Sequence, residues 1–358
     1  MKTNKRIAII IPSLGMGGAE RVASELANEM LSRNIYVHFF LLDNDDIYYD
    51  LDKKVKIDFV EFDSNKNRLS RNIYRIKKLR NLLKINSIDV VISFLTSANF
   101  LSILSTINLK VKVFVSERSN PNIDSKKIKF MRNCLYRMAD GCVFQTVDAI
   151  NIFRGKIKKN GIVIENPVKK GLPKWNSVKK HNDSIVTACR LEESKNIPML
   201  LYSFSAICKK YSNYKLFIYG DGPEKDNLNQ LINKYKLNNN VFLEGKNANW
   251  HNEAIKSKIF ILTSNYEGMS NSLLEALSMG IPTISTDHPI GGARALIVNS
   301  KNGFLIPIND TEVLTQKMFE LIENSELQKK FSIEAEKINE KFDIKNITDK
   351  WLDYILKE

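Results

Sequence analysis

Apolar segments of strand length alternate with segments of helical periodicity along almost the whole of this 358-residue chain. The pattern starts with an isoleucine-rich run at residues 6–12, which leads into a glycine-rich loop and then an amphipathic helix over 21–32. Strands that alternate with helices pair in parallel, because each helix carries the chain back to the starting edge of the sheet. The sequence therefore predicts an α/β protein with parallel, doubly wound sheets covered by helices on both faces.

The alternation occurs twice, with an interruption near the middle of the chain. A polar stretch at 169–183, with a glycine, a proline and several lysines, separates the two series of strands. We predict an N-terminal domain over 1–168, a linker over 169–183 and a C-terminal domain over 184–344. An amphipathic helix within 345–358 is expected to pack back onto the first domain. Because ligands bind at the carboxyl ends of parallel strands, we expect the two domains to face each other across a cleft.

The composition is that of a soluble enzyme, with 43% hydrophobic and 26% charged residues. No cleavable signal peptide is expected, because only a few apolar residues follow the basic start before Pro12. The longest uncharged run, 92–109, carries Ser, Thr and Asn throughout and is not expected to span a membrane. The four cysteines show no C-x-x-C spacing, which favours reduced thiols in a cytosolic protein: Cys134, Cys142, Cys189 and Cys208.

The net charge of +14 indicates an anionic partner. Nucleic acid, an anionic membrane leaflet and a phosphorylated substrate all fit such a charge, and so does a solvated lysine-rich surface without a partner. No helix-turn-helix, zinc-finger or RNA-binding signature accompanies the basic residues, so nucleic acid is not the expected partner.

Two carboxylates, Glu267 and Glu275, are separated by seven residues in a segment typical of a loop that turns into a helix. Gly268 would allow the loop a backbone conformation that other residues resist, and Asn271 or Ser272 would cap the helix. Glu267 would then lie at the lip of a pocket, with Glu275 one helical turn inside.

The backbone amides at the start of this helix, those of Asn271, Ser272 and Leu273, lie between the two carboxylates. Helix N-termini bind anions through such amides and through the helix dipole. Carboxylates that hold sugar hydroxyls, with a phosphate site between them, predict a nucleotide-sugar site.

Cations and glycines stand at other strand ends of the second domain. Arg190 and Lys195 follow the strand expected at 184–189, where a guanidinium fork and an ammonium would neutralise a diphosphate. A leaving nucleoside diphosphate gains negative charge, so these cations would also assist catalysis. A solvated surface pair is the alternative. The turn at Gly220 is adequately explained as a local turn, and His288 fits a structural role better than a catalytic one.

The first domain offers a glycine loop after its first strand, at residues 15–18. It is not a dinucleotide fingerprint, because Glu20 occupies the third glycine position and an acid repels a pyrophosphate. Two interpretations of this loop remain: a tight structural turn, or a loop whose glycines let a phosphate come close to the backbone. The sequence contains no recognisable metal-binding motif, because the histidines are scattered and the cysteines are not closely spaced in pairs.

These motifs together resemble the family 4 retaining glycosyltransferases of the GT-B fold, which use nucleotide-sugar donors. The resemblance covers nearly the whole chain and is carried by 17–21, 190–196, 220–222, 267–275 and 280–286. Within the family the chain is similar to N-acetylgalactosaminyltransferases that extend undecaprenyl-diphosphate glycans. That finer likeness is carried by 92–99, 116–120 and 287–292. The GT-B fold implies two Rossmann-like domains.

The resemblance implies roles for the residues already singled out. Arg190 and Lys195 would hold the donor diphosphate, Glu275 the ribose hydroxyls and Glu267 the donor sugar ring, with no nucleophilic role assigned to Glu267. Further donor contacts would come from Asn271, Ser272, Leu273, Gly268 and Gly220.

For the first domain, the resemblance implies that Gly17 and Gly18 let acceptor and diphosphate approach. Relatives often carry a histidine after the fifth strand, where this chain has Arg118, which would bind acceptor or phosphate instead. No metal or other cofactor is expected.

The segment 64–84 combines eight cations with an apolar stripe. Such a helix suits an anionic membrane surface or a polyprenyl diphosphate, with Arg71 and Arg75 as candidate phosphate ligands. An ordinary surface helix with a buried stripe is the alternative. Lys126, Lys127 and Lys129 indicate a second basic segment.

The resemblance thus implies transfer of a hexose or N-acetylhexosamine from a UDP-sugar to a polyprenyl-diphosphate-linked saccharide. The enzyme would work on the cytoplasmic face of a bacterial membrane, in capsule, O-antigen or related polysaccharide synthesis. Two alternatives stay open at this point. One is a nucleotide-sugar epimerase on the same architecture, and the other is a non-catalytic basic binding protein.

Overall fold

The computed structural model describes residues 5–43, 47–60, 67–176, 181–247 and 249–357. The chain divides into two compact units, Met1–Pro167 with Asp343–Glu358 as unit 1 and Val168–Phe342 as unit 2. Val168 and Phe342, at the two ends of unit 2, are joined by a hydrogen bond from N to O of 2.8 Å. The chain therefore enters and leaves unit 2 at neighbouring points.

Unit 1 is built on a seven-stranded, fully parallel sheet in the order β3-β2-β1-β4-β5-β6-β7. The strands are β1 (Arg6–Ile11), β2 (Tyr36–Leu41), β3 (Lys56–Phe59), β4 (Val90–Phe94), β5 (Lys112–Ser116), β6 (Gly141–Phe144) and β7 (Gly161–Val163). The helices are α1 (Gly18–Ser32), α2 (Arg68–Ile85), α3 (Thr96–Thr106), α4 (Lys126–Leu135), α5 (Val147–Asn151), α6 (Gly155–Lys159) and α14 (Ile344–Ile355). Apolar side chains bury the central strands completely, as at Ile7–Ile11.

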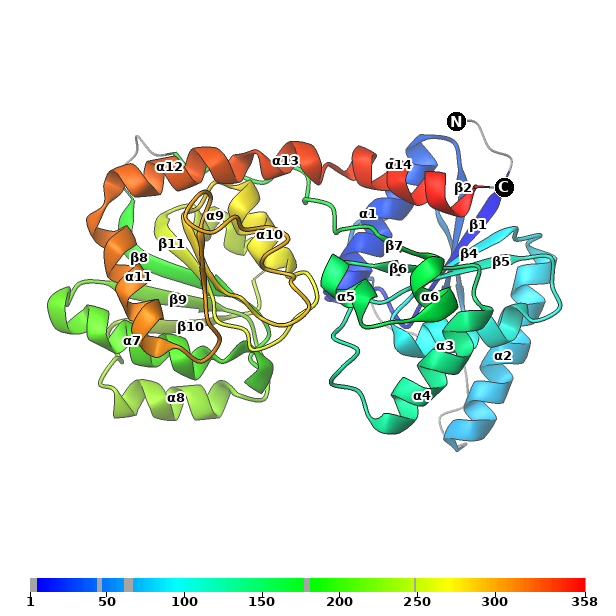
Figure 1. Cartoon of the computed structure of the whole chain (residues 1–358), viewed down its shortest axis with the longest axis horizontal. Coiled ribbons are helices and arrows are strands. Elements are labelled where there is room, and N and C mark those ends of the chain that lie inside the picture. Colours follow the sequence, from blue (N-terminus) through cyan, green and yellow to red (C-terminus); the bar gives the residue numbers. More distant parts are fainter. Residues whose placement is uncertain (1–4, 44–46, 61–66, 177–180, 248, 358) are drawn as a thin grey trace. The chain divides into compact units, whose positions relative to one another are not determined.

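The C-terminal helix α14 packs against α1 within unit 1 (Figure 1). Trp351 is fully buried beside Phe94, with 5.8 Å between ring centroids. Arg33, the C-cap residue of α1, pairs with Asp349, and the hydroxyl of Tyr354 accepts a hydrogen bond of 3.1 Å from the amide of Cys142. The chain thus returns to its first unit to complete that unit's core.

Unit 2 holds a six-stranded parallel sheet in the order β10-β9-β8-β11-β12-β13. Its strands are β8 (Asn182–Ala188), β9 (Lys215–Tyr219), β10 (Val241–Gly245), β11 (Ser257–Leu262), β12 (Thr283–Thr286) and β13 (Phe304–Ile306). Its helices are α7 (Ile197–Lys210), α8 (Lys225–Lys234), α9 (Trp250–Ala254), α10 (Asn271–Ser278), α11 (Thr311–Glu323), α12 (Ser325–Glu336) and α13 (Ile338–Lys341). Figure 1 shows α7 and α8 on one face of this sheet and α9 and α10 on the other.

The doubly wound α/β fold is confirmed, and β1, β8, α1 and α14 stand where the sequence predicted strands and helices. Helix α3 was missed, because it lies in the uncharged run 92–109 and has no polar face to reveal its period. Some of its hydroxyl groups bond within the helix: that of Thr106 donates to the carbonyl oxygens of Ser102 and Ile103, each at 3.0 Å. None of the helices in the described part of the chain is both long and apolar enough to cross a bilayer.

The segment predicted as a linker, 169–183, belongs to unit 2 rather than standing between the units. Trp175 is buried there, and its indole nitrogen donates to the carbonyl of Ser257 at 2.9 Å. Its ring stacks on His181 with 4.1 Å between centroids. Residues 177–180 lie outside the described part.

Candidate active site

The centre of the candidate site is an ion pair between Lys195 and Glu267 in unit 2. Lys195 ends the turn that follows β8, and Glu267 stands in the loop after β11, the strand beside β8. The Lys195 ammonium lies 2.9 Å from Oε1 of Glu267, and the Ser264 hydroxyl donates to the same oxygen at 2.5 Å. The two side chains of the pair are only 12% and 11% exposed. Adjacent parallel strands thus bring together two residues that are 72 positions apart.

The carboxylate of Glu267 stays ionised at neutral pH although it is buried. Burial alone would raise its pKa, but the charges of Lys195 and His288 and the hydrogen bonds from Ser264 and Lys195 outweigh it and hold the pKa below 4.5. The site therefore contains a fixed anion whose positive partner can also bind a ligand phosphate.

The second carboxylate, Glu275, lies inside α10 and is 5% exposed. Its Oε2 is 2.7 Å from Nε2 of His251, which comes from α9. His251 was not predicted as a site residue. It stands in a helix of five residues after an asparagine-rich loop, and a histidine beside a tryptophan carries no specific signal.

The start of α10 differs from the prediction in two details. Ser270 caps the helix, not Asn271 or Ser272, and its hydroxyl accepts from the amide of Leu273 at 3.4 Å. One of the three amides proposed for anion binding is therefore already engaged. Gly268 was expected to adopt an unusual backbone conformation, but it is not among the positive-φ residues of the described chain.

Gly268 does not show the unusual backbone conformation that was expected, but it lies in close contact with a second glycine, Gly292. A Cβ on Gly292 would lie 1.7 Å from the carbonyl oxygen of Gly268, so the loop after β12 can pack here only with glycine. In that loop Ile290 has φ of 77°, a conformation that is costly for a β-branched residue. His288 is fully buried in the same loop, and its Nε2 meets no hydrogen-bond acceptor among the described residues.

The absence of a side chain at Gly220 lets the turn after β9 pack closely against the turn after β8. Its φ is 137°, and a Cβ there would stand 1.8 Å from the carbonyl oxygen of Cys189. The next residue, Asp221, accepts a backbone hydrogen bond of 3.0 Å from Leu191. Gly220, predicted as a donor-binding residue, thus shapes the loop that carries Arg190.

Arg190 itself is not joined to the Lys195–Glu267 pair. Its side chain is 73% exposed and pairs with Glu192 at 2.8 Å. A guanidinium in this position is open to a ligand that arrives from solvent, whereas Lys195 must be shared with Glu267.

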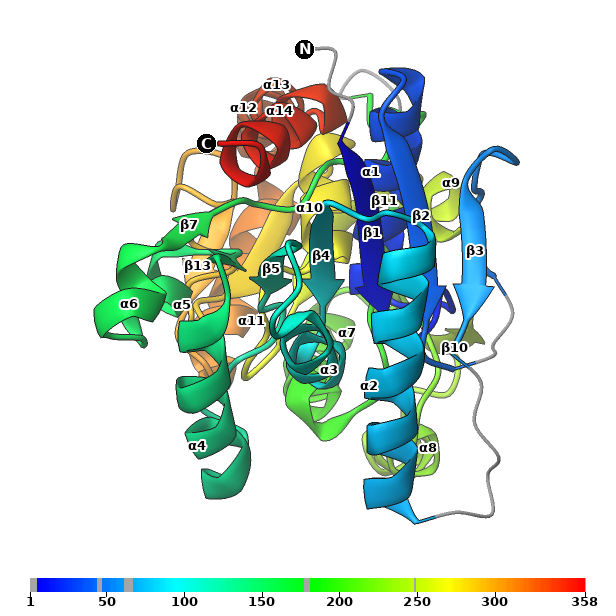
Figure 2. The ribbon, with the colours of Figure 1, turned by 90° about the vertical axis from the view of Figure 1, so that its right-hand side faces the viewer.

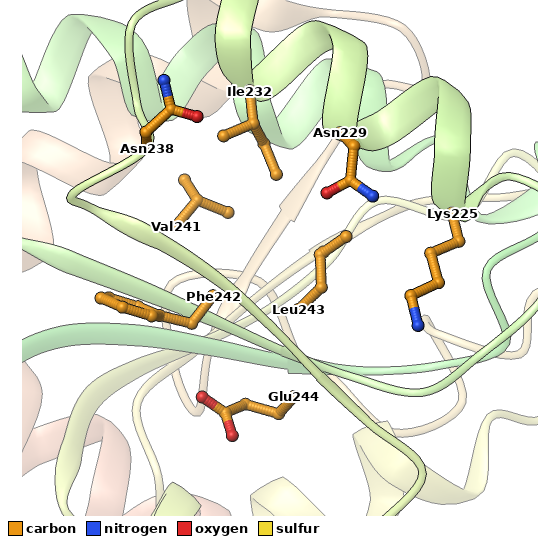
Figure 3. A pocket seen from close by; sticks show the side chains of 8 residues that line it. All are labelled: Lys225, Asn229, Ile232, Asn238, Val241, Phe242, Leu243 and Glu244. Atoms are coloured by element: carbon orange, nitrogen blue, oxygen red, sulfur yellow. The ribbon is translucent and has the colours of Figure 1, made fainter.

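Two hollows lie on unit 2. One of about 390 Å³ borders the site and is lined by the Asn196 loop, the start of α8 and Asn265. The other, also about 390 Å³, lies between α8 and the edge strand β10 (Figure 3). None of the predicted site residues lines either hollow. In the described part of the chain, no three His, Cys, Asp or Glu side chains are grouped to hold a metal ion.

In unit 1, Gly17 caps α1 and lies under the carboxylate of Glu20. A Cβ on Gly17 would be 2.0 Å from Oε2 of Glu20, and the Tyr49 hydroxyl donates to the Gly17 carbonyl at 3.0 Å. Gly18 is the first residue of α1. The side chain of Glu20 thus occupies the space beside the loop that was predicted to admit a diphosphate.

The apolar stripe predicted on the basic helix is divided between core and surface. Leu79 and Leu83 are buried, whereas Leu69 is 71% and Ile73 47% exposed. The surface-helix alternative therefore describes the C-terminal half of α2, and the N-terminal half presents apolar groups to solvent.

Several predicted cations of α2 have partners in the protein. Arg75 pairs with Asp43 and donates to the carbonyl of Leu42 at 2.7 Å, at the end of β2. Arg71 is partly buried, and its Nε has no acceptor among the described residues. Lys66 and the side chain of Arg68 lie outside the described residues.

Arg118 follows β5 and lies at the carboxyl edge of the sheet of unit 1. Its Nη1 donates to Oδ1 of Asn166 at 2.7 Å, and that oxygen also accepts from Gln145 at 2.8 Å. These three residues follow the neighbouring strands β5, β6 and β7.

The preceding residue, Glu117, has a structural role. It is buried, lies 3.0 Å from the guanidinium of Arg132, and accepts from the Tyr136 hydroxyl at 3.0 Å. Burial raises its pKa against the opposing effect of Arg132. The pair fixes α4 to the end of β5, while Arg118 engages a different set of neighbours.

Comparison with known proteins identifies both halves of the chain. Residues 16–169 match the family described as "Glycosyltransferase Family 4", and residues 172–338 match "Glycosyl transferases group 1". This chain is a glycosyltransferase. A relative of 28% identity, over 98% of this chain and 100% of its own length, is the Campylobacter jejuni N-acetylgalactosamine-N,N'-diacetylbacillosaminyl-diphospho-undecaprenol 4-alpha-N-acetylgalactosaminyltransferase. An uncharacterized glycosyltransferase of Haemophilus influenzae is also 28% identical, over 97% of this chain and 99% of its own length.

Solved structures share the fold of this glycosyltransferase. S. aureus TarM, crystallised with Fondaparinux, alpha-GlcNAc-glycerol and UDP, matches with a TM-score of 0.80 and 18% identity, over 98% of this glycosyltransferase and 99% of TarM. Anabaena HepE in complex with UDP and glucose matches with a TM-score of 0.83 and 17% identity, over 99% and 100% of the two chains. These likenesses confirm the GT-B fold.

Proposed function

We propose that this glycosyltransferase transfers a hexose or N-acetylhexosamine from a UDP-sugar to a polyprenyl-diphosphate-linked saccharide. The buried Lys195–Glu267 pair beside the start of α10 carries the proposal, because it combines a cation for a diphosphate with a carboxylate for sugar hydroxyls. The C. jejuni relative, named for an undecaprenol-linked acceptor, supports the acceptor class. Bacterial surface polysaccharide, such as capsule or O-antigen, is the proposed destination of the product.

In the proposed reaction, Lys195 and the exposed Arg190 bind the donor diphosphate. Glu275, held by His251, takes the ribose hydroxyls, and Glu267 takes hydroxyls of the donor sugar. The acceptor oxygen forms a bond to the anomeric carbon as the bond from that carbon to the phosphate oxygen breaks. The proton of the acceptor hydroxyl passes to the departing diphosphate, and attack from the same face retains the anomeric configuration. The cations stabilise the charge that the leaving group gains, so the proposal requires no metal.

We further propose that α2 and α4 of unit 1 hold the enzyme on an anionic membrane at the cytoplasmic face. The two helices lie on either side of α3 (Figure 2). Apolar side chains project from both, with Leu69 at 71% and Phe130 at 71% exposure. Lysines stand beside them, as at Lys126 and Lys127 of α4. Exposed apolar groups among cations are the features of an interfacial helix.

The test incubates the purified enzyme with a panel of UDP-sugars and a synthetic polyprenyl-diphosphate-linked N-acetylhexosamine. Products are identified by mass spectrometry, with EDTA present and absent. We expect one sugar mass to be added from one donor, at equal rates in both conditions, and to be lost in Glu267→Ala. Glu320→Ala, which changes an exposed carboxylate of unit 2 paired with Lys317, is the matched control and should retain the activity.

Other results would overturn the proposal. Conversion of a UDP-sugar into its epimer without an acceptor would identify an epimerase. UDP binding without transfer to any lipid-linked saccharide would contradict the acceptor class. Activity that EDTA abolishes and a divalent cation restores would contradict metal independence.

A further inference from the structure

Arg118 is partly buried in unit 1, and its guanidinium has no ionic partner among the described residues. Among the described residues no acceptor reaches its Nε or Nη2, and both atoms are shielded from solvent. Its hydrogen bond from Nη1 to Asn166 engages a neutral amide. The other cations near this strand end are paired, as Arg132 is with Glu117. Arg118 therefore stands apart as a cation that the described part of the chain leaves without a counter-charge.

The aromatic surroundings of Arg118 increase the free-energy cost of keeping its charge away from water. Its guanidinium carbon lies 5.0 Å from the ring centre of Phe94 and 5.8 Å from that of Trp351, so aromatic rings take the place of water. Burial lowers the pKa of the guanidinium to about 9, with no charged group acting to restore it. The aromatic rings compensate for part of the lost hydration, but an unpaired buried cation remains unfavourable.

The free donors of Arg118 are arranged for an oxyanion. Nε and Nη2 share one edge of the planar guanidinium, and their N–H groups point in parallel, which matches two oxygens of a phosphate or carboxylate. Asn166 occupies Nη1 and fixes the plane of the group. On the aromatic side, Nε1 of Trp351 is a further buried N–H group without an acceptor among the described residues.

The position of Arg118 also favours a ligand. It follows β5, between the ends of β4 and β6, and ligands of parallel α/β sheets bind at the carboxyl ends of the strands. A structural role would require an ionic partner for the charge; Glu117 has one, and Arg118 has none among the described residues.

We propose that Arg118 is an anion-binding group of unit 1 and that its Nε and Nη2 bind two oxygens of a substrate diphosphate. The choice of a diphosphate rests on the proposed function, in which the donor and the acceptor each carry one. The donor diphosphate and the acceptor diphosphate share this chemistry, and the experiment distinguishes which of them Arg118 binds. Without its anion the guanidinium destabilises unit 1, and the ligand converts that cost into affinity.

The experiment measures thermal unfolding of the full chain, alone and with inorganic pyrophosphate, farnesyl diphosphate or UDP. It compares the wild type with Arg118→Met and with Arg137→Met, which removes an exposed arginine of the same unit as the matched control. We expect Arg118→Met alone to melt higher than both other proteins in the absence of ligand. Pyrophosphate should raise the melting temperature of the wild type and of Arg137→Met, and its dissociation constant should rise at least about tenfold in Arg118→Met.

The ligand arms identify the source of the diphosphate. If Arg118→Met loses the response to farnesyl diphosphate and keeps that to UDP, the acceptor diphosphate binds here; the opposite pattern assigns the donor. Arg118→Lys, which keeps the charge but not the fork, should fold and bind pyrophosphate more weakly than the wild type. If Arg118→Met does not fold, the weaker pyrophosphate binding of Arg118→Lys tests the proposal in its place.

Undiminished pyrophosphate binding in both variants, or an Arg118→Met protein that is no more stable than Arg137→Met, would overturn the inference. These readouts need no sugar transfer. A missing transferase activity with an Arg118-dependent pyrophosphate response would therefore contradict the proposed reaction and leave the anion site standing.

Discussion

The ammonium of Lys195 and the carboxylate of Glu267 lie 2.9 Å apart at the carboxyl ends of two adjacent strands, β8 and β11. In the unliganded enzyme each neutralises the other, so a donor diphosphate that binds Lys195 must share it with Glu267. The pair therefore affects stability and catalysis together.

Lys195→Met should destabilise unit 2, because it leaves the buried Glu267 carboxylate without its cation. Removing one partner of a buried pair typically costs about 3–5 kcal/mol. The double variant Lys195→Met/Glu267→Gln should recover part of this loss although it is inactive. Urea unfolding of the two single variants and the double variant measures the coupling energy, and strictly additive effects would show that the pair does not interact.

The pH dependence of stability should carry the signature of Glu267. Because its folded-state pKa lies below 4.5, its contribution is complete above about pH 4.5 and is lost as the pH falls through the folded-state value. Glu267→Gln should therefore lose less stability than the wild type as the pH falls below the ordinary pKa of a glutamate. Unfolding free energies across this range provide the measurement, and parallel curves for the two proteins would contradict it.

Gly220→Ala should disturb donor binding and stability together. The new Cβ would stand 1.8 Å from the Cys189 carbonyl oxygen, which forces the turn that carries Arg190 to move. We expect a loss of about 2–4 kcal/mol, from the positive φ and the collision combined. Gly171→Ala is the matched control, because its φ of 72° is also positive but nothing lies within 4 Å of the new Cβ. Equal losses in both variants would attribute the effect to φ alone.

His251→Gln should raise the KM for the UDP-sugar with a smaller effect on kcat, because His251 orients Glu275 and does not itself contact the reacting atoms. Loss of a hydrogen bond to a charged group corresponds to about a tenfold change. The effect should largely vanish when Glu275 is already replaced by Gln. His181→Gln, which changes a histidine stacked on Trp175, should leave KM unchanged.

Leu69→Ser/Phe130→Ser should weaken binding to anionic vesicles, because each side chain is 71% exposed and would otherwise enter the interface. Cosedimentation with anionic and with neutral vesicles gives the partition coefficients, and we expect at least about a tenfold loss on anionic vesicles. Ile333→Ser, an exposed apolar position on α12 of unit 2, is the control. Equal binding by all three proteins would contradict a membrane role for α2 and α4.

The sequence sufficed for the architecture because strand and helix periods are local properties of the chain. It also sufficed for Glu267 and Lys195 as candidates, since each is tied to a recognisable strand end. Their direct contact was not predicted, because it depends on β8 and β11 being neighbours in the sheet. His251 was missed for the same reason: its partner Glu275 is 24 residues away on another helix.

For Arg118, the sequence analysis predicted a role but not the neighbours of the side chain. The family resemblance implied that it binds acceptor or phosphate, but the pattern carries no information about which neighbours compensate a charge. The sequence Glu117-Arg118 could equally be a local ion pair. In the structure Glu117 pairs with Arg132, and Arg118 faces Phe94 and Trp351.

The neighbouring entry and exit of the chain at Val168 and Phe342 make unit 2 an insertion within unit 1. During synthesis, every residue of unit 2 leaves the ribosome before Trp351, the side chain that completes the core of unit 1. Unit 2 can therefore fold first, while the sheet of unit 1 waits for its last helix. A nascent chain that stops short of α14 would carry a finished unit 2 attached to an unfinished unit 1.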